Sequence, residues 1–280
     1  MFGYINWFLL KIDEYVKIMV MEGYNMLFEF DESREAVINP NNLVDKVDGI
    51  PEVAIACFSK TLFDKIVEGA KCMVIREDCN TSGIRTIYEI EYAGKKLALF
   101  RISVGGPAAV NDIEEIHAMG VNKFIVFGNC GVLDKNIDDC SVIIPNEAIR
   151  DEGTSYHYLK SEKTIKVNKK YVDEFKKILD KFGYSYTEGM TWTTDAFYRE
   201  TRKKVDSRVS MGAKCVEMEC SALQAVADFR GFDFFTFFYA GDNLDLPEWD
   251  KRSLSGDVKL DEKSRITILA LELGHKISQQ

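Results

Sequence analysis

Short apolar runs alternate with amphipathic stretches along the chain from Glu52 onward. The apolar runs typical of strands cover residues 53–58, 73–75, 97–104, 123–127 and 234–240. The stretches with helical spacing cover residues 62–68, 110–119, 171–182, 221–232 and 266–277. The run at 234–240 is continuous, which is typical of a strand buried on both faces. This pattern predicts one α/β domain with a mixed central β-sheet flanked by helices.

Residues 85–92 show a second pattern, in which polar and apolar side chains alternate. This period of two is typical of a half-buried strand. The turn residues Ala93-Gly94-Lys95 join it to the apolar run that begins at Leu97. We therefore expect an antiparallel hairpin here.

The first 25 residues form a segment of their own. Their apolar positions recur at helical spacing and are Ile5, Phe8, Leu9, Ile12, Tyr15, Val16 and Met19. We expect an amphipathic extension over residues 1–25, packed on its own domain or on a partner subunit, and a globular domain over residues 26–280. Lys11 interrupts the apolar stretch and no small-residue cleavage site follows, so we expect neither a signal peptide nor a membrane span.

Composition narrows the class of protein. A chain of 280 residues with 46% hydrophobic and 29% charged residues can bury a large core. Its net charge of −9 argues against a nucleic-acid-binding surface, which needs a basic patch. Seven cysteines without a C-x-x-C pair, together with only three histidines, predict no metal site and a reducing cytoplasm.

Two acidic clusters carry the most informative candidate chemistry. The first, residues 215–220, contains Glu219 where a strand passes into a helix, and the second places Asp242 just past the next strand. Ligands bind at that edge of an open α/β sheet. A carboxylate pair there suits a polyhydroxylated ligand, because one group accepts from vicinal hydroxyls and the other donates a proton. The alternative is that Glu219 only complements a helix N-terminus and Asp242 only starts a turn.

Further motifs stand in a fixed series along the chain. They are Val104-Gly105-Gly106-Pro107-Ala108-Ala109, Gly128-Asn129-Cys130-Gly131, residues 150–158 and Thr194-Asp195-Ala196-Phe197-Tyr198. With these motifs, residues 50–275 resemble the nucleoside phosphorylase superfamily in its uridine phosphorylase and purine nucleoside phosphorylase branch. The resemblance implies a homo-oligomeric glycosyltransferase of nucleoside metabolism, with inorganic phosphate as co-substrate and no other cofactor.

The resemblance assigns ribose and base contacts. Glu219 would accept from the 2′ and 3′ hydroxyls of ribose and Met218 would pack on the sugar, whereas Glu217 contacts the ribose or simply faces solvent. Asp242 would protonate the leaving base, and Asn243 beside it would contact that base. Phe197 would stack on that base, and the alternative for it is a place in the core.

Two departures from the uridine phosphorylase pattern indicate whether the nucleoside carries a purine or a pyrimidine base. Those enzymes have Asn-Arg near the second acidic cluster, where this chain has Gly241-Asp242-Asn243. They also have a Gln-x-Arg clamp after the aromatic residue, where this chain has Thr201 and Lys203. Both departures favour a purine nucleoside.

The phosphate site departs from the family pattern as well. Leu62 and Val126 stand where the familiar phosphate arginines are expected. The trimeric purine branch suggests Ser59 and Arg101 as substitutes. Asn129 stands at the hydroxyl position of the family pattern, and Gly105 would let its backbone N–H approach the phosphate or the sugar closely. The alternative for Arg101 is an ion pair with Glu89 or Glu91 across the hairpin.

Two further positions complete the candidate site. His157 would contact the 5′ side of the ribose, and Arg85 would reach a neighbouring subunit. The leading hypothesis is reversible phosphorolysis of a purine nucleoside to the free base and ribose 1-phosphate. The alternatives are a uridine phosphorylase, a hydrolytic nucleosidase and a non-catalytic nucleoside-binding protein.

Overall fold

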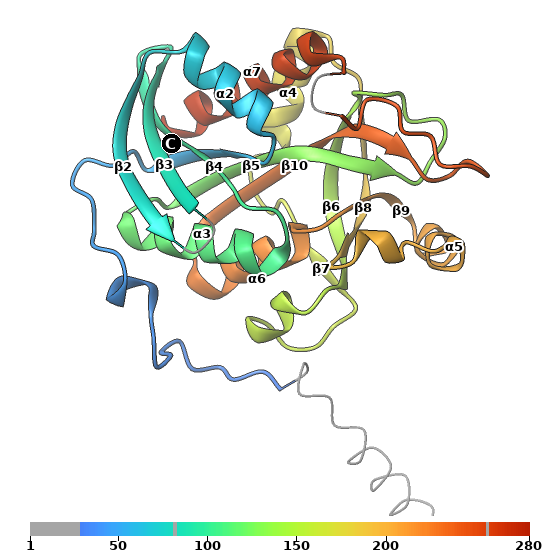
Figure 1. Ribbon diagram of the computed structural model, residues 1–280, viewed down its shortest axis with the longest axis horizontal. Helices are drawn as coiled ribbons and strands as arrows, with labels where there is room; N and C mark the ends of the chain where they lie inside the picture. Colours follow the sequence, from blue (N-terminus) through green and yellow to red (C-terminus); the bar gives the residue numbers. More distant parts are fainter. Residues whose placement is uncertain (1–28, 81–82, 256–257) are drawn as a thin grey trace, which may run out of the picture.

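A computed structural model describes residues 29–80, 83–255 and 258–280, so the expected extension over residues 1–25 lies outside the described residues. The described residues form a mixed ten-stranded sheet with helices on both faces, which confirms the predicted fold class (Figure 1). The strands are β1 Val53–Cys57, β2 Cys72–Asn80, β3 Gly83–Tyr92, β4 Lys95–Arg101, β5 Lys123–Val132, β6 Val142–Asp151, β7 Thr164–Lys166, β8 Tyr186–Thr194, β9 Ala213–Glu217 and β10 Asp233–Asn243. The helices are α2 Lys60–Gly69, α3 Gly106–Met119, α4 Val172–Phe182, α5 Arg202–Ser210, α6 Cys220–Arg230 and α7 Leu260–Ile277.

The centre of the sheet is parallel. Strand β1 pairs in parallel with β4 and β5, and β10 runs parallel to β5 on its other side. Strands β5, β10, β6, β8 and β9 pair in a closed ring, because β9 returns to β5. Parallel strands bring their carboxyl ends to one edge, and this edge is where the candidate residues were expected.

Alternation along β1 explains the two layers of helices. Val53 and Ile55 pack in the cluster that contains α2, α4 and α7, whereas Ala54 and Ala56 face the cluster that contains α3 and α6. Figure 1 shows these two groups of helices on opposite sides of the parallel strands. Every residue of β1 is buried, as expected for a strand covered on both faces.

The predicted hairpin is confirmed. Strands β3 and β4 pair antiparallel, with Tyr92 opposite Lys95. The two residues between them, Ala93 and Gly94, have φ of 49° and 76°. A two-residue turn with both residues in the left-handed region matches the twist of the strands.

Strand β10 extends further than predicted. Asp242 therefore lies within this strand rather than just past it, which corrects the expectation. The reason is that β5 also continues, so that Asp242 pairs with Gly131 and Asn243 with Val132. The register shifts between Ala240 and Asp242, as in a β-bulge, which re-aims side chains at the end of a strand. In the parts of the chain that the structure describes, no helix is both long and apolar enough to cross a membrane.

Candidate active site

The carboxyl edge of the parallel strands gathers most of the predicted site residues. Ser59 follows β1, and Arg101 ends β4 opposite Cys57 in the register. Asn129 lies in β5 opposite Tyr239 of β10, three residues before Asp242. Glu219 precedes α6 at the end of β9. Residues more than 180 positions apart in the sequence are thus brought to one edge of the sheet.

Glu219 joins the starts of two helices. It is the N-cap residue of α6, yet its side chain makes no capping hydrogen bond to that helix. Instead, its Oε1 accepts a hydrogen bond of 2.6 Å from the backbone N–H of Gly105, the N-cap residue of α3. Gly105 has a φ of 93°, a conformation that favours glycine. Gly105 was predicted to offer its N–H to phosphate, and the structure corrects this because Glu219 takes that N–H.

Burial dominates the electrostatics of Glu219. The loss of solvent, and then the charge of Glu217, raise the pKa of the Glu219 carboxyl to about 8. The Gly105 N–H acts in the opposite direction. A buried carboxyl that holds its proton near neutral pH is able both to donate to and to accept from the hydroxyls of a ligand. Met218 beside it is half-buried.

Glu217 is a structural anchor rather than a ribose or solvent contact, which corrects both expectations for it. The side chain is buried, and burial raises its pKa. Its Oε1 accepts from the hydroxyls of Thr193 (2.6 Å) and Thr191 (3.2 Å) of β8. Its Oε2 accepts from the backbone N–H groups of Glu219 (2.8 Å) and Cys220 (2.6 Å). Glu217 thus caps α6 and ties it to β8.

We predict that Glu217→Gln destabilises the fold. A glutamine offers one acceptor oxygen and points an NH₂ group at donors, so buried N–H or O–H groups lose their partner. The expected loss is about 3 kcal/mol in the free energy of unfolding, measured by urea denaturation. The matched control is Glu188→Gln, which breaks only the surface ion pair with Lys176 and should cost less than about 1 kcal/mol. Equal stabilities of the two variants would contradict the anchoring role.

Asp242 lies at a buried position with one strong donor. Its Oδ2 accepts a hydrogen bond of 2.7 Å from Nε1 of Trp249. A Cβ atom on Gly131 would lie 3.2 Å from its Oδ1, so the glycine leaves room for the carboxyl group. Burial raises the pKa of Asp242, although the Trp249 N–H and the charge of Arg252 act against the rise. Asp242 is therefore suited to deliver a proton.

Asn243 does not reach the same space, which corrects its predicted base contact. Successive side chains of a strand point to opposite faces. Asn243 is fully buried, and its Oδ1 accepts from the backbone N–H of Asp245 at 2.8 Å. Its backbone forms a bridge with Asp250, which closes the loop after β10.

Asp242 opens into a cavity of about 460 Å³ with aromatic walls. Its lining includes Phe197, Tyr198, Glu200, Trp249 and Leu254. Phe197 is 44% exposed and its ring centroid lies 4.0 Å from that of Tyr198, so Phe197 does not belong to the core. The cavity thus places a buried acid beside an accessible aromatic ring. Trp249 and Glu200 were not among the predicted site residues. The only signal for Trp249 is that it is a tryptophan in the polar segment after β10, and this segment gives no signal for Glu200.

Of the predicted phosphate residues, Ser59 already has a hydrogen-bond partner, whereas Arg101 and Asn129 are exposed. Ser59 caps α2, because its Oγ accepts from the backbone N–H of Leu62 at 3.3 Å. Arg101 is exposed and makes no ion pair with another described residue. The alternative pairing with Glu89 is not observed, because Glu89 pairs with Lys96 at 2.8 Å. Arg101 lines a small hollow of about 100 Å³ with Ser103, and Asn129 is exposed on β5.

Arg85 does not extend toward a neighbouring subunit, which corrects that expectation. Its buried guanidinium pairs with Glu115 (2.6 Å), Asp112 (3.0 Å) and Asp78 (3.2 Å) of the same chain. Three carboxylates around one arginine hold β3 against α3 and β2. His157 is exposed and lines a groove of about 560 Å³ that also contains Asp195 and Pro107.

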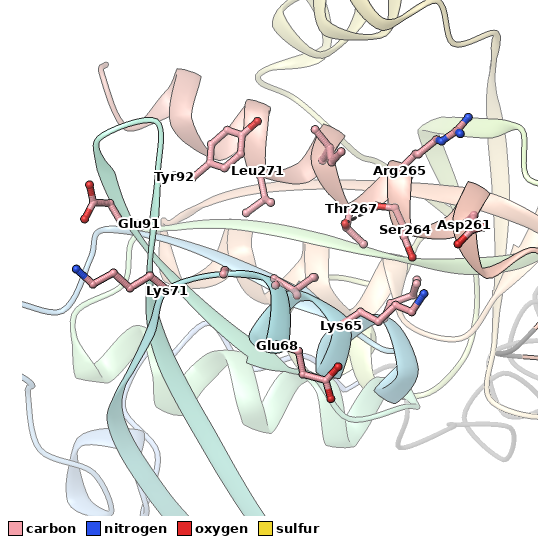
Figure 2. Close-up of a pocket in the computed structure, with 15 residues that line it drawn as sticks. Lys65, Glu68, Lys71, Glu91, Tyr92, Asp261, Ser264, Arg265, Thr267 and Leu271 are labelled. Atoms are coloured by element: carbon pink, nitrogen blue, oxygen red, sulfur yellow. Dashed lines mark hydrogen bonds between the residues drawn. The ribbon is translucent and has the colours of Figure 1, made fainter.

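A larger groove of about 870 Å³ lies away from the strand edge, between α2, the hairpin and α7 (Figure 2). Figure 2 shows Lys65, Lys71, Glu68 and Glu91 around it. None of the predicted site residues is among its described lining residues. The edge that carries Glu219 and Asp242 is therefore the better candidate site.

Residues 52–267 match the family model of the phosphorylase superfamily, and the chain belongs to this superfamily. This confirms the resemblance found in the sequence. The chain is 27% identical to a uridine phosphorylase of Thermococcus kodakarensis over 154 residues, which are 50% of this chain and 56% of that protein. It is 24% identical to a guanosine phosphorylase of Halorubrum lacusprofundi over 229 residues, which are 81% and 91% of the two chains.

Solved structures show the same fold. A purine nucleoside phosphorylase from Toxoplasma gondii, in complex with immucillin-H, superposes with a TM-score of 0.72 at 16% identity, covering 89% of this chain and 98% of that chain. A uridine phosphorylase from Vibrio fischeri superposes with a TM-score of 0.70 at 20% identity, covering 86% and 99%. The fold is thus shared by proteins named for different nucleosides.

Proposed function

We propose that the protein is an enzyme that cleaves the N-glycosidic bond of a purine nucleoside by phosphorolysis, releasing the free base and ribose 1-phosphate. The observation that carries this proposal is Asp242, a buried carboxyl that opens into the cavity with Phe197 at the strand edge that carries Glu219. An acid beside a stacking platform is what a leaving purine requires. The family and its relatives support the class of reaction.

In the proposed mechanism, Glu219 holds the vicinal hydroxyls of the ribose and is itself positioned by Gly105. The C1′–N9 bond breaks with its electron pair moving to the base, and Asp242 gives its proton to N7. A phosphate oxygen then bonds to C1′. Arg101, the Ser59 hydroxyl and Asn129 would hold that phosphate, since an exposed guanidinium and two polar side chains lie at the same edge.

Purine preference rests on what stands after Phe197. Thr201 takes the place of the glutamine in the uracil clamp, and its hydroxyl accepts from the backbone N–H of Lys204 as the cap of α5. Lys203, at the arginine position, is exposed. Neither residue carries the amide or the guanidinium of the Gln-x-Arg clamp. The relatives are named for uridine and for guanosine, so a uridine phosphorylase is the second candidate.

The proposal includes a homo-oligomer in a reducing cytoplasm, with residues 1–25 as an extension and 26–280 as the catalytic domain. Val37, Ile38 and Leu43 support an oligomer, because they are 103%, 66% and 67% exposed next to the groove that His157 lines. Buried free thiols such as Cys57 and Cys130 support a reducing compartment.

Base release from a panel of purine and pyrimidine nucleosides, with and without inorganic phosphate, tests this function. We expect turnover of purine nucleosides only with phosphate. Equal turnover without phosphate would make the protein a hydrolytic nucleosidase. Binding without turnover would make it a non-catalytic nucleoside-binding protein, and turnover of uridine alone would reverse the base assignment.

We predict that Arg101→Ala raises the KM for phosphate about 10- to 100-fold and leaves the KM for the nucleoside nearly unchanged. The reason is the loss of a charge-assisted hydrogen bond, worth about 1.5–3 kcal/mol. Steady-state kinetics with each substrate varied in turn measure both constants. The control is Lys96→Ala, which removes an exposed cation from the same strand. Equal effects of the two variants on the KM for phosphate would show that Arg101 acts only as one surface cation among others and does not bind phosphate.

A further inference from the structure

The carboxyl of Asp242 has a partner that the proposed mechanism does not use. Nε1 of Trp249 donates a hydrogen bond of 2.7 Å to Oδ2 of Asp242, and both residues line the 460 Å³ cavity. Among the residues that the structure describes, no other side chain donates a hydrogen bond to this carboxyl. The two oxygens of Asp242 are therefore not equivalent, because Oδ2 has a donor whereas Oδ1 lies toward Gly131, where a Cβ atom would be 3.2 Å away.

The loop after β10 holds the indole group of Trp249 in place. Trp249 is 57% exposed, so packing in the core does not fix it. Instead, the backbone N–H groups of Asn243 and Asp250 each donate to the carbonyl oxygen of the other residue, at 2.9 and 3.2 Å. The Arg202 guanidinium of α5 ties the start of the same loop by donating to two of its carbonyl oxygens, at 2.6 and 2.7 Å. These bonds close the loop directly beside Trp249 and present its N–H to Asp242.

Other charged and titratable groups surround Asp242 without a hydrogen bond to it. Those that line its cavity or interact with its charge are Cys130 of β5, Glu200, Arg202 of α5, and Asp250 and Arg252 of the loop. Burial raises the pKa of Asp242, and the hydrogen bond from Trp249 opposes this rise more than the charge of Arg252 does. The direct donor is thus the main group that favours the carboxylate form.

The chemistry of the donor decides where the acidic proton lies. An indole N–H can donate a hydrogen bond but cannot accept one. It therefore pairs best with the unprotonated oxygen of Asp242, so the proton of the acid lies on Oδ1. A hydrogen bond to an ionised acceptor is about twice as strong as one between neutral groups. The bond from Trp249 hence gains strength when Asp242 loses its proton.

We propose that Trp249 is a positioning residue of the proposed phosphorylase, which fixes Asp242 through Oδ2, leaves the catalytic proton on Oδ1 and stabilises the carboxylate as that proton departs. This inference rests on the proposed function. When the C1′–N9 bond breaks, its electron pair moves to the base and the Oδ1 proton goes to N7. The negative charge is left on Asp242, where the Trp249 N–H already points at it. Asp242 takes up a proton from solvent before the next turnover, and Trp249 itself transfers none.

The hydrogen bond is tested first without any substrate. The chain has three tryptophans, so its indole N–H signals in ¹H–¹⁵N NMR spectra are few, and Trp249→Phe identifies the signal of Trp249. We expect this signal to move downfield as the pH rises through the ionisation of Asp242, because a charged acceptor forms the stronger hydrogen bond. In Asp242→Asn the signal should not move in this way. A Trp249 signal that behaves alike in the wild type and in Asp242→Asn would overturn the inference.

The second test is the pH dependence of kcat with a purine nucleoside and phosphate. Trp249→Phe keeps an aromatic ring and loses the N–H, so we expect kcat to fall about 10- to 100-fold, as for the loss of a hydrogen bond to a charged group. Activity needs protonated Asp242, so it falls as the pH rises through the pKa of that group. Loss of the donor raises this pKa, so the alkaline limb should move to higher pH in Trp249→Phe. A loss of kcat without that movement would show that Trp249 only lines the cavity.

The matched control is Tyr92→Phe. Tyr92 also donates a hydrogen bond of 2.7 Å from an aromatic side chain to a carboxylate, that of Glu272, and it lines the groove away from the strand edge. Removal of this hydroxyl should leave kcat and its pH dependence as in the wild type. Equal effects of Tyr92→Phe and Trp249→Phe would point to a general loss of stability and would count against the positioning role.

The two tests separate the inference from the proposed function. If the wild type cleaves no nucleoside, the phosphorylase proposal fails, while the NMR titration still decides whether the Trp249 N–H senses the ionisation of Asp242. If nucleosides are cleaved but neither the NMR signal nor the alkaline limb responds as expected, the inference is overturned and the proposed function is unaffected.

Discussion

Asp242→Asn will lower kcat for nucleoside cleavage by about 10²- to 10⁴-fold, the range that a lost general acid produces. An asparagine preserves the shape of the side chain and can still accept from Nε1 of Trp249 through its amide oxygen. It has no acidic proton for the base, so the base must depart as an anion. The KM for the nucleoside should change little, because stacking on Phe197 and the ribose contacts remain.

Nucleosides with better leaving groups provide the decisive comparison for this variant. A nucleoside that carries a low-pKa aglycone needs little protonation, so it should recover much of the lost rate in Asp242→Asn. The matched control is Asp206→Asn on the exposed surface of α5, which should behave like the wild type. The same loss for good and poor leaving groups would show that Asp242 is not the proton donor.

Glu219→Gln will reduce nucleoside turnover severely and yet make the protein more stable at alkaline pH. The NH₂ group that replaces the second carboxyl oxygen cannot accept a hydrogen bond from a ribose hydroxyl, which we expect to lower kcat/KM by at least about 100-fold. The amide oxygen can still accept from Gly105, so the link between α3 and α6 is retained. A functional residue that costs stability is common where a charge must be buried.

The sign of the stability change follows from the raised pKa of Glu219. Between pH 4.5 and 8 the folded protein holds a proton that the unfolded chain has released. The contribution to stability is therefore complete below pH 4.5 and is lost as the pH rises through 8, on the order of 5 kcal/mol in all. The free energy of unfolding of Glu219→Gln does not fall in this way. The variant should therefore be more stable than the wild type in urea unfolding at pH 8, and the difference should vanish near pH 4.5. An equal difference at both pH values would refute the role of ionisation.

Much of the fold follows from local pattern. The all-apolar run that became β1, the alternation of β3 and the turn at Ala93-Gly94 each specify their element through nearest neighbours. The ends of the elements were less predictable. Asp242 falls inside β10 because β5 supplies hydrogen-bonding partners beyond the apolar run, and no residue in β10 itself signals this.

The candidate site, like the fold, was only partly predictable from the sequence. The pattern of residue types along the sequence was sufficient to place Glu219 and Asp242 at one strand edge, and the family resemblance added Phe197. It was not sufficient to separate the tasks of Glu217 and Glu219, which lie only two positions apart. The carboxylate of Glu217 accepts from hydroxyls of β8, whereas that of Glu219 accepts from the N–H of Gly105 at the start of α3.

The sequence by itself therefore determined the α/β class, the hairpin and the acidic residues of the strand edge, because short-range periodicity and residue chemistry encode them. Only the tertiary structure decided which carboxyls are occupied, which hold protons and which share a cavity, as Glu200 and Asp242 do. Those properties depend on burial and on donors that come from distant strands. Folding alone brings such partners within hydrogen-bonding distance.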